Sequence, residues 1–253
     1  MFELQGRTAL VTGAGQGVGA GVAELLARQG AVVAVNDIVA ERAEAVVARI
    51  REAGGAAHTL PFDVTEHGAV GSAVRSFERT VAPVDILVNN AGNGGADGFR
   101  PARFRDSAPG EWQRFADVNL FGVMNVTRAV LDGMCARRYG RVITIASGAG
   151  LQGLNIGVSL YGAAKGGAIA FTRHLAVEHA RDGITANSLA VGLIDPAASG
   201  RQASATVAMA KAIPVGRLGR PADIGAACVF LASQEAEWIT GQTWQINGGA
   251  PTT

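Results

Sequence analysis

Tyr161 and Lys165 are two residues whose types and spacing fit acid–base chemistry. They stand at positions i and i+4, so that on a helix both side chains lie on one face. A free tyrosine has a pKa of about 10 and is a poor base at neutral pH, but a neighbouring ammonium group favours the phenolate. Such a tyrosine can exchange a proton with an alcohol oxygen, which Ser147 could hold by a hydrogen bond. Taken alone, however, a Tyr/Lys pair is more often an ordinary feature of a helix surface.

A glycine-rich turn links the first predicted strand to the first predicted helix. Its glycines let the chain turn sharply and let a pyrophosphate approach the backbone, where free amides and the helix dipole stabilise negative charge. A glycine-rich turn alone is weak evidence, but its place between a strand and a helix favours a dinucleotide site. The residues that we expect against a cofactor here are Gly13, Gln16, Gly17, Val18 and Gly19.

Asp37 stands at the end of the second predicted strand, where a carboxylate can accept hydrogen bonds from both hydroxyls of an adenosine ribose. A 2′-phosphate at that point would meet a like charge, and neither Gln16 nor Ile38 supplies a compensating positive charge. The sequence therefore favours NAD over NADP. The alternative is that Asp37 only caps the N-terminus of the next helix.

Short β-branched runs alternate with longer segments of helical periodicity along the chain. We predict seven strands, over 8–12, 31–35, 56–60, 85–89, 141–145, 184–191 and 243–247. We predict helices over 18–28, 40–53, 67–81, 111–136 and 160–181. Apolar strands separated by helices indicate a parallel sheet covered on both faces, and right-handed crossovers make it doubly wound. Chemistry is then expected beyond the carboxyl ends of the strands.

The composition favours one folded domain with a small partner. The chain has 253 residues, of which 48% are apolar and 17% charged, and this suits a single α/β domain over 1–253. A net charge of +1 gives no general attraction for nucleic acid or an anionic membrane. The N-terminus lacks the features of a signal peptide, which favours a cytoplasmic location. Cys135 and Cys228 stand in apolar contexts, which predicts buried thiols in a reducing compartment.

Neither metal chemistry nor serine hydrolysis is indicated. The histidines show no ligand spacing, and His174 and His179, at i and i+5, do not share a helix face. We therefore expect no metal, and surface or hydrogen-bonded histidines at His58, His67, His174 and His179. Ser147 and Ser159 lack the Gly-x-Ser-x-Gly elbow of a serine hydrolase.

Several motifs in order along the chain resemble the short-chain dehydrogenase/reductase family. They are the glycine-rich turn at 12–19, Asp63 and Val64 after the third strand, Asn-Asn-Ala-Gly at 89–92, Asn119, Ser147, Tyr161 with Lys165, and the segments 216–224 and 239–249. The resemblance covers the full length. It implies a single-domain Rossmann fold, with a doubly wound seven-stranded parallel sheet that carries helices on both faces.

The resemblance implies a catalytic tetrad. Tyr161 would be the acid/base and Ser147 would orient the substrate oxygen. Lys165 would lower the pKa of the tyrosine and bind the nicotinamide ribose, while Asn119 would position a proton-relaying water. Hydride would pass between the nicotinamide C4 and a carbinol carbon. The other implied cofactor contacts are Asp63 and Val64 at the adenine, Asn90, Ala91 and Gly92 on the adenosine side, and Val191, Gly192 and Ile194 near the nicotinamide.

The segment after the sixth predicted strand departs from the family pattern. Most members have Pro-Gly there and, three residues later, a threonine that hydrogen-bonds the nicotinamide amide. This chain has Val191 and Gly192, followed by Pro196, which cannot make that bond. We expect local contacts of the carboxamide mainly from Val191 and Ile194.

The segments expected to wall the substrate site are rich in apolar residues, and they suit an apolar secondary alcohol or ketone. Leu154 and Leu193 are candidate substrate contacts, beside Ser147 and Tyr161. The walls are 94–107, 148–160 and 193–213. The first wall carries arginines at positions 100, 103 and 105, which could reach an anionic substrate tail or simply remain solvated.

The C-terminal third looks most like 3-oxoacyl-acyl-carrier-protein reductases. Those enzymes normally use NADPH, and they dock an acidic carrier with basic residues that include one at the place of Val177. The sequence therefore predicts an NAD-linked alcohol dehydrogenase. An NADPH-dependent 3-oxoacyl-carrier-protein or CoA reductase is the alternative, and a nucleotide-sensing or scaffold protein is an alternative of another class. The family also implies a homotetramer, without nucleic acid or membrane as partner.

Overall fold

The computed structural model describes residues 1–93, 101–195 and 210–250. Within them, seven strands form one sheet in the order β3-β2-β1-β4-β5-β6-β7, and every neighbouring pair is parallel. This order confirms the predicted doubly wound parallel sheet. The strands are β1 Thr8–Val11, β2 Val32–Val35, β3 Ala56–Thr59, β4 Ile86–Asn89, β5 Gly140–Ser147, β6 Ile184–Val191 and β7 Thr243–Ile246.

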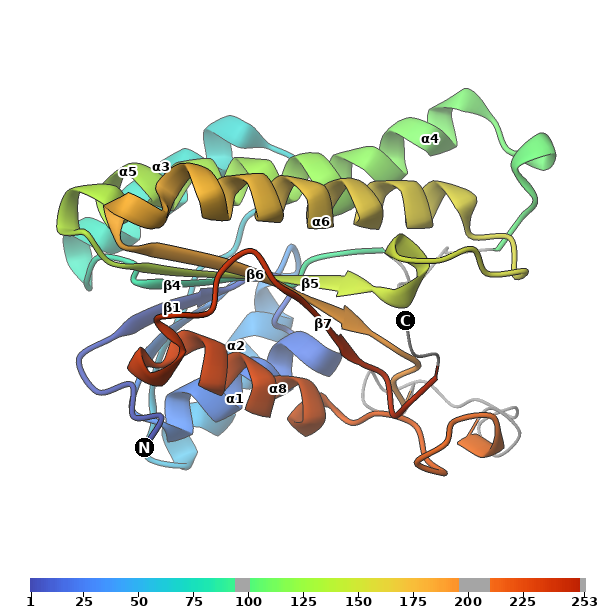
Figure 1. Ribbon diagram of the computed structural model, residues 1–253. Coiled ribbons are helices and arrows are strands. Elements are labelled where there is room, and N and C mark those ends of the chain that lie inside the picture. Colours follow the sequence, from blue (N-terminus) through green and yellow to red (C-terminus); the bar gives the residue numbers. More distant parts are fainter. Residues whose placement is uncertain (94–100, 196–209, 251–253) are drawn as a thin grey trace.

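Helices cover both faces of the sheet, as Figure 1 shows. One layer holds α1 Gly17–Arg28, α2 Ala40–Glu52 and α8 Pro221–Ala232. The other holds α3 His67–Thr80, α4 Pro109–Ala116, α5 Gly122–Arg137 and α6 Ser159–His179. No helix among the described residues combines the length and apolar character needed to cross a bilayer.

Alternate residues of each central strand enter two separate cores, because successive side chains of a strand point to opposite faces. In β1, Ala9 and Val11 pack into the cluster that contains residues of α1, α2 and α8. Leu10 between them packs with residues of α3, α5 and α6. Because both faces are buried, the strands read in the sequence as nearly continuous apolar runs rather than as alternating ones.

The segment predicted as one helix over 111–136 consists of three elements. Helix α4 ends at Ala116, a π-helical turn covers Asp117–Phe121, and α5 begins at Gly122. A π-turn adds a residue to one helical turn, and such turns are frequent at functional sites. Asn119 lies in the middle of this turn. The apolar periodicity runs across all three elements, so the sequence predicted a single helix.

Helix α8 is absent from the sequence-based prediction. Its segment is apolar almost all round and therefore lacks the amphipathic period that identifies a surface helix. It lies directly against α1, and a Cβ at Gly21 would come within 2.4 Å of the Pro221 side chain. The other predicted elements differ from the observed bounds by at most two residues.

Candidate active site

The carboxyl ends of the strands bring the predicted site residues to one edge of the sheet. The glycine-rich turn follows β1, Asp37 follows β2 and Asn90 follows β4. Ser147 is the last residue of β5 and pairs in register with Val191, the last residue of β6. Because all seven strands are parallel, segments distant in sequence meet at this edge.

The glycine-rich turn packs directly on the segment after β4. Gly13 and Gly17 have φ values of +58° and +57°, which favour glycine, and a Cβ at Gly13 would lie 2.8 Å from the Ala91 Cα. Asn90 Nδ2 donates hydrogen bonds to the carbonyls of Thr12 and Gly13, both at 2.9 Å. The Asn90 side chain therefore holds the turn in place.

The N-terminus of α1 is suited to an anionic group. Gln16 precedes the helix without a side-chain hydrogen bond to it, and no acidic residue lies in the first turn. The first amides of a helix have no partner within the helix, and its dipole favours a negative charge there. Close approach at Gly13, together with these uncapped amides, fits the pyrophosphate of a dinucleotide.

The Asp37 carboxylate is buried and held by two backbone amides. Oδ2 accepts from the Gly15 N–H and Oδ1 from the Val39 N–H, both at 3.0 Å. A carboxylate offers about four lone-pair sites, so each oxygen retains capacity for ribose hydroxyls. The N-cap residue of α2 is Val39 rather than Asp37, and the Val39 side chain makes no capping hydrogen bond. Asp37 therefore contacts the start of α2 through the amide of the N-cap residue.

Sequence reasoning missed Arg42 as a neighbour of this carboxylate. A Cβ at Gly15 would come within 2.6 Å of both the Arg42 Cβ and Asp37 Oδ2, so the two side chains lie against the same glycine. Arg42 is exposed and lies in the first turns of α2. A basic residue five positions after the strand-end aspartate was the signal in the sequence that could have indicated this neighbour.

Two further predicted adenine-side residues are placed close to the strand ends. The Asp63 carboxylate accepts from the Thr65 N–H at 2.9 Å and from the Thr65 hydroxyl at 2.8 Å. Val64 is buried, and its side chain would be 2.8 Å from a Cβ at Gly122. Ile38, beside Asp37, is by contrast largely exposed.

Ser147 and Tyr161 are brought together by the close packing of the β5–α6 connection on α6. Their side chains are hydrogen-bonded to each other, and Ser147 Oγ also accepts from the Ala149 N–H at 3.2 Å. A Cβ at Gly162 would lie 2.6 Å from the Ala149 carbonyl oxygen. The glycine after Tyr161 therefore permits the close approach that aligns the two hydroxyl groups.

Lys165 is buried beside this pair. Its Nζ donates to the Ile145 carbonyl at 2.9 Å and lies 5.9 Å from the centre of the Tyr161 ring. Burial lowers the pKa of Lys165 to about 8, because the ammonium form loses hydration. Lys165 would therefore lose its positive charge at a pH only slightly above neutral.

The pKa of Tyr161 is raised in the protein alone, chiefly by desolvation, and the hydrogen bond with Ser147 opposes that rise only in part. The expected lowering of this pKa combined Lys165 with the positive nicotinamide ring of a bound cofactor, and in the protein alone the effect of burial on the Tyr161 pKa is the larger one. The physical reason is that burial disfavours both charged forms, the phenolate and the ammonium. A lowered pKa of Tyr161 would need additional positive charge.

Asn119 points inward from the π-turn and is fully buried. Its Nδ2 donates to the Phe115 carbonyl and to Asn93 Oδ1, while its Oδ1 has no hydrogen-bond partner within the described residues. A Cβ at Gly92 would lie 2.9 Å from Asn119 Oδ1 and 3.2 Å from Lys165 Nζ. A buried acceptor and a buried ammonium thus face the same small space, which suits a bridging water.

The predicted nicotinamide side is only partly described. Gly192 donates from its N–H to the Ile246 carbonyl at 3.0 Å, and Ile194 forms a parallel bridge with Gly219. Val191 lies half-buried at the end of β6. Pro196 and Arg100 lie outside the described residues.

The described parts of the predicted substrate walls carry exposed apolar side chains. The residues 101–107 are tied to the 148–158 connection by a hydrogen bond from the Ala102 N–H to the Gly157 carbonyl. Sequence reasoning missed the stack of Phe104 on Trp112, whose ring centres are 5.2 Å apart. The large exposed apolar residues in these segments are Phe104, Leu151, Leu154, Ile156 and Leu193.

Comparisons with known proteins identify the family. The family model described as Enoyl-(Acyl carrier protein) reductase matches residues 13–251. A 3-oxoacyl-acyl-carrier-protein reductase from Vibrio harveyi is 38% identical over 252 residues, which cover 98% of each chain.

Two solved structures are similar over nearly the whole fold. A gluconate 5-dehydrogenase from Burkholderia cenocepacia in complex with NADP and tartrate has a TM-score of 0.88 and 37% identity, covering 98% of this chain and 96% of that one. A 3-oxoacyl-acyl-carrier-protein reductase from Brucella melitensis with bound NAD has a TM-score of 0.89 and 32% identity, covering 98% and 92%. The chain thus belongs to the short-chain dehydrogenase/reductase family and is an oxidoreductase that acts on CH–OH or keto groups.

Proposed function

We propose that this chain is an NAD-dependent enzyme that interconverts an apolar secondary alcohol and its ketone. The observation that carries the proposal is the hydrogen-bonded Ser147–Tyr161 pair beside the buried ammonium of Lys165. A bound NAD would supply the hydride chemistry and, when oxidised, a positive ring that favours a phenolate.

The chain's own residues would then hold and move one proton. Tyr161 exchanges it with the substrate oxygen, and Ser147 orients that oxygen through its hydroxyl. Lys165 keeps two ammonium protons beyond its bond to Ile145, and these are available to a cofactor ribose and to a water. Asn119, whose Oδ1 faces the same space, would hold that water and so connect the buried site to a proton relay.

The preference for NAD rests on Asp37. Its carboxylate is held by two backbone amides and, within the described residues, makes no ion pair, so a 2′-phosphate would meet negative charge. Family membership does not decide this point, since the similar structures contain NADP in one case and NAD in another. Arg42 acts against this preference, because its side chain begins near Asp37 and its positive charge would attract a 2′-phosphate.

The remaining cofactor contacts stay as proposed from the sequence, with one change. Asp63 and Val64 would contact adenine, Ala91 and Gly92 the adenosine side, and Val191, Gly192 and Ile194 the nicotinamide. For Asn90 we propose a positioning role, because its side-chain amide is hydrogen-bonded to the glycine-rich turn.

A 3-oxoacyl-carrier-protein or CoA reductase that uses NADPH is the second candidate, favoured by the similarity to the Vibrio harveyi enzyme. The exposed face of α6 weighs against it. Val177 is 77% exposed at the place where the family's carrier-dependent reductases have a basic residue. An acidic carrier would find no charge at that position.

Assembly and location also remain proposals. Trp238 is 96% exposed and Val177 is 77% exposed, and such exposed apolar side chains support the predicted homotetramer. We propose that residues 1–253 act as one domain and that the enzyme is cytoplasmic.

The proposal is tested by turnover against a substrate panel. Purified protein is assayed with apolar ketones, apolar secondary alcohols, sugar acids and 3-oxoacyl thioesters, with NAD(H) and NADP(H) in separate reactions. We expect the highest kcat/KM for an apolar ketone or alcohol with NAD(H). A higher kcat/KM for NADPH with a 3-oxoacyl thioester would establish the second candidate instead.

A further inference from the structure

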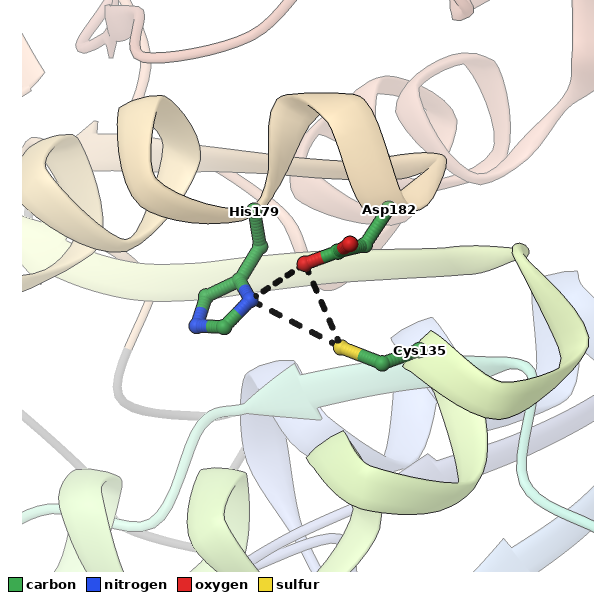
Figure 2. A group of neighbouring side chains, drawn as sticks. All are labelled: Cys135, His179 and Asp182. Atoms are coloured by element: carbon green, nitrogen blue, oxygen red, sulfur yellow. Dashed lines mark hydrogen bonds and ion pairs between the residues drawn. The ribbon is translucent and has the colours of Figure 1, made fainter.

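Three side chains of types that can bind a metal ion lie together at the edge of the sheet opposite the candidate active site. Cys135 lies in the last turn of α5, His179 is the last residue of α6, and Asp182 ends the 3-10 turn Ala180–Asp182 that follows. Figure 2 shows their side chains converging between the two helix ends. The cysteine is half-buried rather than buried as predicted, and the proton-transfer chemistry proposed above uses none of the three.

The distances between the donor atoms fit a shared ion. Cys135 Sγ lies 3.6 Å from His179 Nδ1 and 3.9 Å from Asp182 Oδ2, and His179 Nδ1 lies 2.9 Å from Asp182 Oδ2. Tetrahedral zinc with bonds of about 2.0–2.3 Å holds such donors about 3.4–3.6 Å apart. The observed distances bracket that range, so small side-chain adjustments would complete the geometry.

The arrangement differs from a nucleophilic triad. In a triad the imidazole uses one nitrogen for the nucleophile and the other for the carboxylate. Here the thiol and the carboxylate both approach the same nitrogen, Nδ1 of His179. Three donor atoms that converge on one point suit a common ion rather than a proton relay.

The electrostatic surroundings favour a cation. Helices α5 and α6 both end here, and helix C-termini carry partial negative charge. The nearby Arg137 is engaged elsewhere, with the Val84 carbonyl at 2.7 Å and with Asp85.

We propose that Cys135, His179 and Asp182 form a zinc site that ties the end of α5 to the turn after α6. A mixed set of sulfur, nitrogen and oxygen ligands suits Zn²⁺, and His179 would bind through deprotonated Nδ1 with its proton on Nε2. The side chains of His179 and Asp182 are 26% and 42% exposed, which leaves a fourth position open to water. Sequence spacing could not reveal this site, because its ligands come from different elements.

The test uses the full chain without a histidine tag, freed of metal by a chelator. Zinc is titrated calorimetrically, and cobalt is used as a spectroscopic probe of tetrahedral coordination by a thiolate. The wild type should bind one zinc per chain and give a cobalt–thiolate charge-transfer band. Cys135→Ser should remove that band and weaken zinc binding by more than about tenfold, as expected for loss of a direct ligand.

Matched controls separate this site from other cysteines and histidines. Cys228→Ala removes the buried second cysteine, and His174→Gln removes an exposed histidine on the same helix as His179. Both should bind zinc as the wild type does. Circular dichroism checks folding, and if Cys135→Ser does not fold, His179→Gln and Asp182→Asn are compared with the same controls.

The proposal is overturned if the folded wild type binds no stoichiometric zinc at micromolar concentration. It is equally overturned if the ligand substitutions leave zinc affinity and the cobalt spectrum unchanged, or if the control substitutions abolish binding.

Discussion

Two buried cations at opposite ends of one strand behave differently. Arg141, near the start of β5, donates hydrogen bonds to the carbonyls of Ser233 and Gly140 and lies 4.4 Å from the centre of the Tyr139 ring. Lys165 reaches the other end of β5, where its ammonium has one hydrogen bond within the described residues, to Ile145. Burial lowers the pKa of both groups.

The difference in hydrogen bonding distinguishes a structural cation, Arg141, from a candidate functional cation, Lys165. Arg141 donates to two backbone carbonyls and contacts the Tyr139 ring, and we infer a structural role for it. Lys165 keeps donor capacity directed to the space beside Gly92, which it shares with the unpartnered Asn119 Oδ1. A cation kept buried with incomplete hydrogen bonding is costly, and we infer that it is retained for its role in proton transfer.

The largest effect that would test this contrast comes from removing each charge. Lys165→Met should lower kcat/KM by about 10²–10³-fold, as for loss of one charge-stabilising donor, without loss of stability. Arg141→Met should retain turnover but lower the free energy of unfolding by about 1.5–3 kcal/mol, since it loses hydrogen bonds from a charged group. Kinetics and chemical denaturation measure the two quantities, and the reverse pattern would invalidate the contrast.

The pH dependence of stability should carry a contribution from Lys165. The pKa of Lys165 is about 8 in the folded protein against 10.5 for an unperturbed lysine, so the unfolded chain binds more protons between these values. Below pH about 8 the folded protein bears the full free-energy cost of burying the Lys165 ammonium. As pH rises to about 10.5 this cost is lost, and the free energy of unfolding increases by about 3 kcal/mol.

Denaturation of wild type and Lys165→Met across this pH range measures that contribution, because other titrating groups cancel in the difference. Relative to the variant, the wild type should gain stability as pH rises. If the difference in free energy of unfolding between wild type and variant stays constant with pH, the pKa of Lys165 is not lowered by burial.

Replacing Asp37 tests the other buried charge at the carboxyl edge. Asp37→Ala should reduce the preference of kcat/KM for NADH over NADPH by about 10–100-fold, because a hydrogen-bonded charge is lost. In the same background, Arg42→Ala should lower NADPH use again if Arg42 meets the 2′-phosphate. A wild type that already prefers NADPH would contradict the proposed role of Asp37.

Filling the space beside Gly92 should have a smaller effect. A methyl group there would lie 2.9 Å from Asn119 Oδ1 and 3.2 Å from Lys165 Nζ, where a relaying water is proposed. Gly92→Ala should lower kcat by about tenfold, because the added methyl group displaces the water from the proton relay. Gly68→Ala, at a position with open space around its Cβ, is the matched control. Equal effects of the two substitutions on kcat would contradict the proposed relaying water beside Gly92.

The sheet could be predicted from the sequence because its strands are short, apolar and bounded by turn residues. The position of Ser147 and Tyr161 at the carboxyl edge followed from the same pattern. Helix α8 was missed because a helix that is apolar all round has no amphipathic period. The π-turn at Asn119 was missed because one inserted residue does not interrupt an apolar pattern.

Two contacts between distant segments could not be predicted from the sequence. Arg42 beside Gly15, and Cys135 beside His179, depend on how helices end and pack, which periodicity does not encode. The raised pKa of Tyr161 was missed for a related reason, since desolvation is a property of the folded environment.

Proton transfer by Tyr161 is tested most directly by exchanging each of the two tyrosines for phenylalanine. Tyr139 is the matched control, because it stacks on Arg7 and Arg141 away from the carboxyl edge. With the best substrate of the panel, Tyr161→Phe should lower kcat/KM by about 10²–10⁴-fold while NADH still binds, and Tyr139→Phe should retain turnover. Wild-type turnover in a folded Tyr161→Phe variant would contradict the account.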